Sequence, residues 1–137
     1  MHQMKDIIGG YVMTEISTSI AQSNTLLSWG ISKYTADMFW LVTSEPHLHV
    51  LGDEDLSNYD RWENYPAWSF PKLFAMLPCL ETKCRVDHPM LHKLEHGNSC
   101  AYWINYKYKR IHTDFCKSPI EAAVSMIKIL INKGYKI

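Results

Sequence analysis

The segment that begins at Ser118 constrains the fold of this 137-residue chain more than any other. Serine at 118, proline at 119 and glutamate at 121 are the residues of a helix start, in which the serine caps the first turn and the glutamate can return a hydrogen bond. Apolar residues then recur at spacings of three and four, at Ala123, Met126, Ile127, Leu130 and Ile131. Gly134 is a typical residue just beyond a helix end. We therefore expect an amphipathic helix over about 119–133, whose apolar stripe must pack on another element.

The nearest partner for this helix is an alternating stretch just before it. Residues 100–106 place Tyr102, Ile104 and Tyr106 on one side and Trp103 on the other, which is typical of a half-buried strand. Residues 109–115 alternate as well, so we expect a hairpin over about 100–115 that turns near Lys107. The helix should cover one face of this hairpin, and the face that carries Trp103 should point outward.

The sequence predicts shorter elements upstream. They are a helix that begins between Ser19 and Ser23 and ends near Gly30, a turn capped by Ser32, paired strands over 39–43 and 47–51, a polar loop over 52–64, and a helix over about 69–77. The stretch 79–99 is the least regular, and we expect one helical turn over 89–96 that Gly97 ends.

Together these elements predict a small single α+β domain. N-terminal helices come first, a short antiparallel sheet includes the hairpin over about 100–115, and the C-terminal helix packs on that sheet. Gly9-Gly10 separates a flexible tail, residues 1–10, from the domain over residues 11–137.

Composition bounds the functional class. The 14 basic residues balance the 14 acidic ones, so the chain has no global attraction to nucleic acid or to an anionic membrane. Acidic residues gather over 45–63 and basic ones from residue 105 onward. The first residues contain no signal peptide, and no stretch is apolar enough to span a bilayer. We expect a soluble, cytoplasmic protein whose four cysteines are reduced.

Histidines and cysteines form the sharpest local pattern. The candidate metal ligands are Cys79, Cys84, His88, His92 and His96. On a helix the three histidines would share one face, and two thiolates with two imidazoles are a ligand set of structural zinc sites. The spacing is far shorter than in a zinc finger, and Pro89 disturbs a helix that begins at His88. The alternative is a polar surface turn without zinc or any other cofactor.

Catalytic motifs are absent from the sequence. There is no glycine-rich phosphate loop, no GxSxG and no HExxH. His112 and Cys116 lie four residues apart, but on a strand that spacing is about 13 Å, too far for a nucleophile and its base. Whether the chain is an enzyme stays open, with the sequence favouring a non-catalytic role.

Aromatic residues of the hairpin alternate with cations. Trp103 precedes Lys107, Lys109 and Arg110, and such a surface can bind protein or stack single-stranded bases. Part of the aromatic set must face the C-terminal helix, which argues against nucleic acid. We expect these four residues to mark an interaction surface.

Three stretches carry a resemblance. They are LLSWGISKYTADMFW (26–40), PAWSFPKLFAMLP (66–78) and SPIEAAVSMIKILINKGYKI (118–137). In this order they resemble a family of small uncharacterised proteins from gut bacteria and their phages and mobile elements. The resemblance implies a fold and a mobile-element setting, and it implies no activity. The chain departs from the family pattern over 79–99.

These observations favour an accessory protein that acts by binding an unidentified protein or by self-association. The alternatives are a small zinc-stabilised module and a single-stranded nucleic-acid-binding protein.

Overall fold

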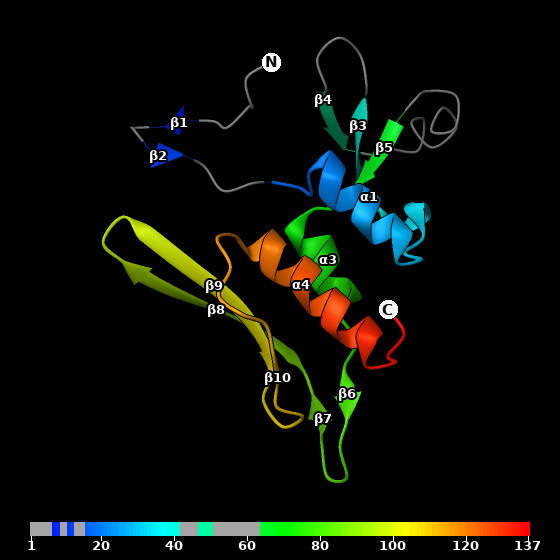
Figure 1. The fold of residues 1–137 in the computed structure, drawn as a ribbon, viewed down its shortest axis with the longest axis vertical. Coiled ribbons are helices and arrows are strands. Elements are labelled where there is room, and N and C mark those ends of the chain that lie inside the picture. Colours follow the sequence, from blue (N-terminus) through cyan, green and yellow to red (C-terminus); the bar gives the residue numbers. More distant parts are fainter. Residues whose placement is uncertain (1–6, 9–10, 13–15, 42–46, 51–63) are drawn as a thin grey trace. The chain divides into compact units, whose positions relative to one another are not determined.

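The computed structural model describes residues 7–8, 11–12, 16–41, 47–50 and 64–137 (Figure 1). Helices and short antiparallel sheets follow one another along the described chain, which confirms the α+β class. The chain divides into two compact units, Met1–Ser69 and Phe70–Ile137. The division into a tail over 1–10 and a single domain over 11–137 stays a prediction.

The first unit places one helix beside a three-stranded sheet. Its elements are β1 (Ile7–Ile8), β2 (Tyr11–Val12), α1 (Ile20–Ser28), the 3-10 turn η1 (Lys33–Thr35), β3 (Met38–Leu41), β4 (His47–Val50) and β5 (Asn64–Ala67). The sheet order is β4-β3-β5, so the predicted strand pair is confirmed. The predicted loop over 52–64 lies outside the described residues except for Asn64, and the predicted tail lies outside them except for Ile7–Ile8.

Local capping explains where the first helix begins and ends. Ser19 accepts the backbone N–H of Gln22, and the Gln22 side chain accepts the backbone N–H of Ser19. Gly30 has a φ of 89°, a left-handed conformation that suits glycine after a helix. The predicted helix start and end are therefore confirmed, as is the Ser32 cap of η1.

A buried threonine ties this helix to the sheet. The Thr18 hydroxyl accepts the backbone N–H of Trp68 at 3.0 Å and lies 2.8 Å from the Ser23 hydroxyl. The Thr18 carbonyl accepts the indole N–H of Trp40 at 3.0 Å. Thr18, Ser23 and Trp68 are fully buried, so water cannot take the place of these hydrogen-bond partners.

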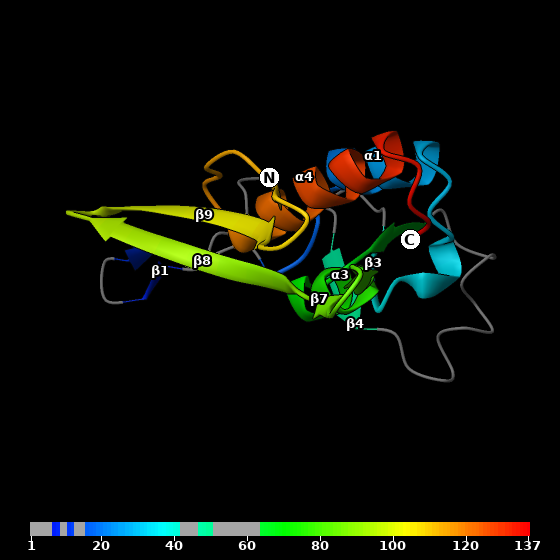
Figure 2. The same cartoon turned by 90° about the horizontal axis from the view of Figure 1, so that it is seen from below.

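The second unit carries the hairpin and the C-terminal helix. Its elements are α3 (Phe70–Met76), β6 (Leu80–Glu81), β7 (Val86–Asp87), β8 (Pro89–His96), β9 (Ser99–Tyr106), β10 (Ile111–His112) and α4 (Pro119–Asn132). Strand β9 lies between β10 and β8 in an antiparallel sheet. Helix α4 packs on α3 and on β9, and in both views the turn end of β8–β9 extends beyond α4 (Figures 1 and 2).

The C-terminal helix is confirmed almost residue for residue. The Ser118 hydroxyl accepts the Glu121 N–H at 3.1 Å, and Ala123, Met126, Ile127 and Leu130 are fully buried. Glu121 does not return a bond to Ser118 as expected; its carboxylate accepts the N–H of Lys117 instead. Among the described residues, no helix combines the length and the apolar character that a membrane crossing requires.

The prediction of a helical turn over 89–96 is wrong. Residues Pro89–His96 form strand β8, which pairs with β9 from Pro89↔Tyr106 to His96↔Ser99. Gly97 and Asn98 are then the two residues of a hairpin turn, and Gly97 has a φ of 60° with glycine at the first turn position, as in a type II′ turn. The long ladder to β9 outweighs the local four-residue spacing of the histidines, and Pro89 is tolerated because it begins the strand.

A buried carboxylate holds the other end of this hairpin. Asp87 is 1% exposed, and its Oδ2 accepts the backbone N–H groups of Tyr108 at 3.0 Å and Lys109 at 2.7 Å. The turn over residues 107–110 lacks the glycine of a tight hairpin turn, so its shape depends on this side chain. The predicted turn near Lys107 is confirmed.

We expect Asp87→Ala to lower the free energy of unfolding by about 2–3 kcal/mol, because two charge-assisted hydrogen bonds are lost and two backbone donors lose their acceptor. Asp87→Asn keeps an acceptor oxygen and should cost less than half as much. Urea denaturation followed by circular dichroism measures both, and equal losses for the two variants would contradict this role.

Candidate functional site

The outward side of the β10-β9-β8 sheet is the candidate site. We call it the outer face, and its residues are Met90, His92 and Leu94 of β8, Ala101, Trp103 and Asn105 of β9, His112 of β10, and Phe115. On the opposite side of β9, Ile104 and Tyr106 are fully buried. Met90, Leu94 and Phe115 are 51%, 54% and 70% exposed. The outer face therefore presents apolar side chains to solvent, as interaction surfaces commonly do.

Trp103 lies at the centre of an aromatic group on this face. Its ring stacks on His92 with centroids 5.1 Å apart and planes 14° apart, and Phe115 meets it edge-on at 5.0 Å and 81°. The pairing His92↔Trp103 across β8 and β9 sets the stack. The Nε2 of His92 lies 2.8 Å from Oδ1 of Asn105, and because an amide oxygen only accepts, the imidazole donates.

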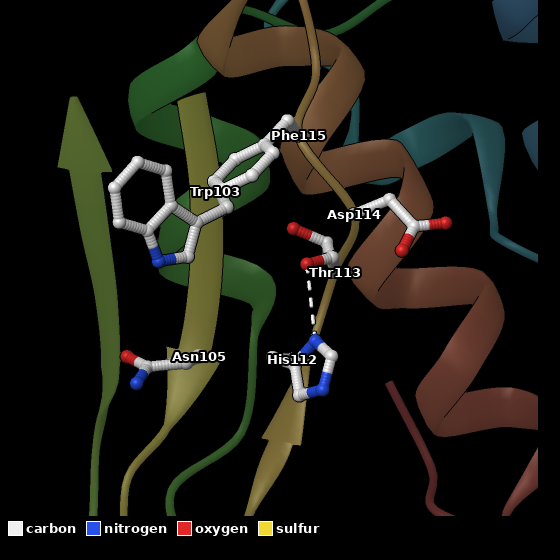
Figure 3. Close-up of a pocket in the computed structure, with 6 residues that line it drawn as sticks. All are labelled: Trp103, Asn105, His112, Thr113, Asp114 and Phe115. Atoms are coloured by element: carbon white, nitrogen blue, oxygen red, sulfur yellow. Dashed lines mark hydrogen bonds between the residues drawn. The ribbon is translucent and has the colours of Figure 1, made fainter. Parts of the chain in front are cut away.

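Next to Trp103 the face is hollowed. The hollow has a volume of about 640 Å³ and is lined by Trp103, Asn105, His112, Thr113, Asp114 and Phe115 (Figure 3). The His112 Nδ1 donates to the Thr113 carbonyl at 3.3 Å, and the Thr113 hydroxyl accepts the Ile104 N–H, so the floor is tied to β9. Among the described residues that line the hollow, Asp114 is the only formally charged one, and none is a lysine or an arginine.

The predicted interaction surface divides into two places. Trp103 belongs to the outer face, whereas Lys107, Lys109 and Arg110 are exposed in the turn after β9. Lys107 follows Trp103 by four residues, about 13 Å along a strand. In the turn, the Arg85 guanidinium lies 4.3 Å from the centroid of the Tyr108 ring, and the Lys107 ammonium lies 5.5 Å from it. Of the three predicted cations, Lys107 therefore contacts Tyr108, and none of the described residues that line the hollow is a lysine or an arginine.

Only two of the five predicted metal ligands come together. Cys79 Sγ lies 3.1 Å from His88 Nδ1, and both residues are exposed. His92 lies in the outer face, and His96 is four residues further along β8, about 13 Å away. Cys84 is exposed between β6 and β7.

The helical arrangement on which the zinc hypothesis depended is therefore wrong. Within the described residues there is no group of three or more side chains that could hold a metal ion. A zinc site stays a prediction, and its geometric support is reduced to Cys79 and His88.

Cys116 is a buried thiol and not a nucleophile poised beside His112. It is 8% exposed, and burial raises the pKa of its thiol, against the effect of a hydrogen bond from Ser125. The raised pKa means less thiolate at any pH below it, and thiolate is the nucleophilic form. His112 donates to the Thr113 carbonyl, whereas the hydrogen-bond partners of the Cys116 thiol are the Asp114 carbonyl and Ser125.

Sequence reasoning placed Trp103 on the outward side of β9, but it did not identify Asp114, Phe115 or the β8 residues as parts of the same face. Phe115 and Asp114 lie in an irregular segment between β10 and α4, where no periodicity marks them. Strand β8 had a readable signal: Gly97-Asn98 lies between two stretches of strand length, a pattern typical of a tight hairpin.

Comparison of the chain with protein-family models, with curated proteins and with solved structures gave no match. The resemblance to small proteins of gut bacteria and their mobile elements therefore stays a prediction.

The cysteines should differ in reactivity. Cys79, Cys84 and Cys100 are exposed and Cys116 is buried, so we expect three thiols to react with a thiol-specific alkylating reagent in the native protein at pH 8. The fourth should react only after unfolding, because its raised pKa and its burial both oppose attack. Mass spectrometry of the alkylated peptides assigns each site, and rapid native labelling of Cys116 would disprove this.

Proposed function

We propose that this chain is an accessory protein that acts by binding another protein, with the outer face as its contact surface. The main support for this proposal is the aromatic hollow beside Trp103, which lies open on a sheet face that also has exposed apolar residues. The mobile-element setting is a part of this proposal that rests on the sequence resemblance alone.

The geometry of the outer face suits a protein partner. Trp103 is held between His92 and Phe115, so its ring loses little further freedom when a partner covers it. Aromatic side chains of this kind commonly carry most of the energy of an interface. The apolar residues Met90 and Leu94 lie on the same face and extend the contact area along β8.

The charge of the hollow indicates what the partner presents. Asp114 is exposed and lines the hollow, and its carboxylate points away from the Trp103 ring (Figure 3). A bound segment could therefore stack one side chain on an aromatic ring while a neighbouring lysine or arginine pairs with the carboxylate. We therefore propose that the bound segment places an apolar side chain against Trp103 and a basic side chain against Asp114.

Single-stranded nucleic acid fits this face less well. A stacked base needs cations nearby for its phosphate, and the hollow's lining, as far as the structure describes the chain, includes a carboxylate and no lysine or arginine. Lys107 of the 107–110 turn already contacts the Tyr108 ring, which the Arg85 guanidinium also contacts. Asp114 would repel a phosphate bound beside Trp103.

A displayed library of random peptides, selected on the immobilised protein, tests the proposal. We expect enriched peptides to contain a lysine or arginine beside apolar residues. Trp103→Ala should weaken their binding at least about tenfold, and Asp114→Asn should weaken peptides with the basic residue more than their alanine-substituted forms.

Val86→Ala is the matched control, since Val86 is an exposed apolar residue of the same unit outside the outer face. This variant should bind the peptides as the unmodified chain does. Selection that yields no peptide, or peptides that Trp103→Ala binds equally well while it stays folded by circular dichroism, would show that the outer face is not the binding surface.

A further inference from the structure

The outer edge of β8 is a second surface, which shares Leu94 with the outer face and lies apart from the hollow. Strand β8 is eight residues long and lies at the edge of the β10-β9-β8 sheet. Nothing in the part of the chain that the structure describes pairs with this edge. Its second half, from Lys93 to His96, is exposed and lies on the hairpin end that extends beyond α4 (Figure 2). Long free edges of this kind are templates for pairing with another strand.

The backbone groups on this edge follow from the bonds of β9. Tyr102 exchanges two hydrogen bonds with Cys116, at 2.8 and 2.7 Å, and the Ile104 carbonyl accepts the Thr113 N–H at 2.9 Å. Residues 102 and 104 thus point their backbone groups away from β8, so residues 101, 103 and 105 point theirs toward it. The β8 partners of these three are Leu94, His92 and Met90. The N–H and C=O groups of Leu91, Lys93 and Glu95 therefore point outward from the free edge.

We infer that a second copy of this chain pairs with this edge, with β8 antiparallel to β8 about a two-fold axis at Leu94. In that register Lys93 lies opposite Glu95 of the second copy, and Glu95 lies opposite Lys93 of the second copy. Both pairs use outward-pointing backbone groups, so each makes two ladder hydrogen bonds. The opposed charges make the strand complementary to itself.

Charge selects this register over its neighbours. An axis at Lys93 would place the two lysines opposite each other, and an axis at Glu95 would do the same for the two glutamates; like charges directly opposite are destabilising. An axis at His92 would place Pro89 opposite Glu95, and proline has no N–H to give to the ladder. Only the axis at Leu94 aligns opposite charges.

Leu94 contributes the apolar part of the contact. The side chain is 54% exposed in the single chain, and at the axis it would meet its own copy across a non-hydrogen-bonded pair, where side chains approach most closely. The Lys93 and Glu95 side chains, now 2.7 Å apart within one chain, are held in place for the two cross-strand pairs.

This self-association does not rest on the proposed function, because it uses the edge of β8 and leaves the hollow open. The two proposals are also measured differently. Peptide selection reports on the hollow, and the association of the chain with itself reports on the edge.

A cysteine at the axis tests the register. In a background with Cys79, Cys84 and Cys100 changed to Ser, we expect Leu94→Cys to form a disulfide-linked dimer under mild oxidation. Residues opposite in a non-hydrogen-bonded pair have Cα atoms about 4.5 Å apart, within the range of a disulfide.

His96→Cys in the same background is the matched control, since it lies on the same face of the same strand. In the proposed register, residue 96 of one copy lies opposite residue 92 of the other. The two cysteines at position 96 would therefore be four residues apart along the strand, about 13 Å, and should not form a disulfide. No linkage at residue 94, or equal linkage at residues 94 and 96, overturns the inference.

A charge exchange tests the same register without cysteine. Lys93→Glu and Glu95→Lys should each weaken the dimer about tenfold in sedimentation velocity, because each places like charges opposite twice. The double variant restores opposite charges and should recover the association of the unmodified chain. An unmodified chain that stays monomeric up to about 1 mM, or a double variant weaker than both single variants, overturns the inference.

Discussion

The packing of β9, whose buried side carries Ile104 and Tyr106, on the C-terminal helix is the contact on which the second unit depends. Both side chains are fully buried, and the Tyr106 hydroxyl donates to the Pro78 carbonyl at 2.7 Å. Burial also raises the pKa of the Tyr106 phenol, so the group stays neutral and keeps its proton for that bond. Because side chains alternate along a strand, the burial of these two residues leaves Trp103 and Asn105 to face outward. One apolar contact thus decides which residues can meet a partner.

Signals that were local in sequence predicted structure well. The C-terminal helix has its cap, its apolar stripe and its final glycine within residues 118–134, and the structure confirms it as α4. The first helix, its Ser19 cap and Gly30 are confirmed for the same reason. Each of these features is decided by neighbours within one or two helical turns, which a sequence displays directly.

Signals that depend on distant residues predicted structure poorly. His88, His92 and His96 have the spacing of one helical face, but β8 is a strand because β9 offers a continuous ladder. The hollow needs Phe115 beside Trp103, and their contact depends on how the segment after β10 returns across the sheet. No pattern of residue types in 107–118 encodes that return, so of the hollow's lining the sequence identified Trp103 alone.

The hairpin of β8 and β9 is held at both ends, by the Gly97-Asn98 turn and by the bonds from Asp87 to the backbone of Tyr108 and Lys109. A single inserted residue in β9 has no loop to enter, and it would either bulge or exchange the two faces of the strand. Length changes that preserve both the fold and the two-residue turn must therefore add or remove two residues on each strand together, because hydrogen-bonded and non-hydrogen-bonded pairs alternate and the turn closes on a hydrogen-bonded pair. Evolution can adjust how far this arm reaches while Trp103 and its neighbours stay in place.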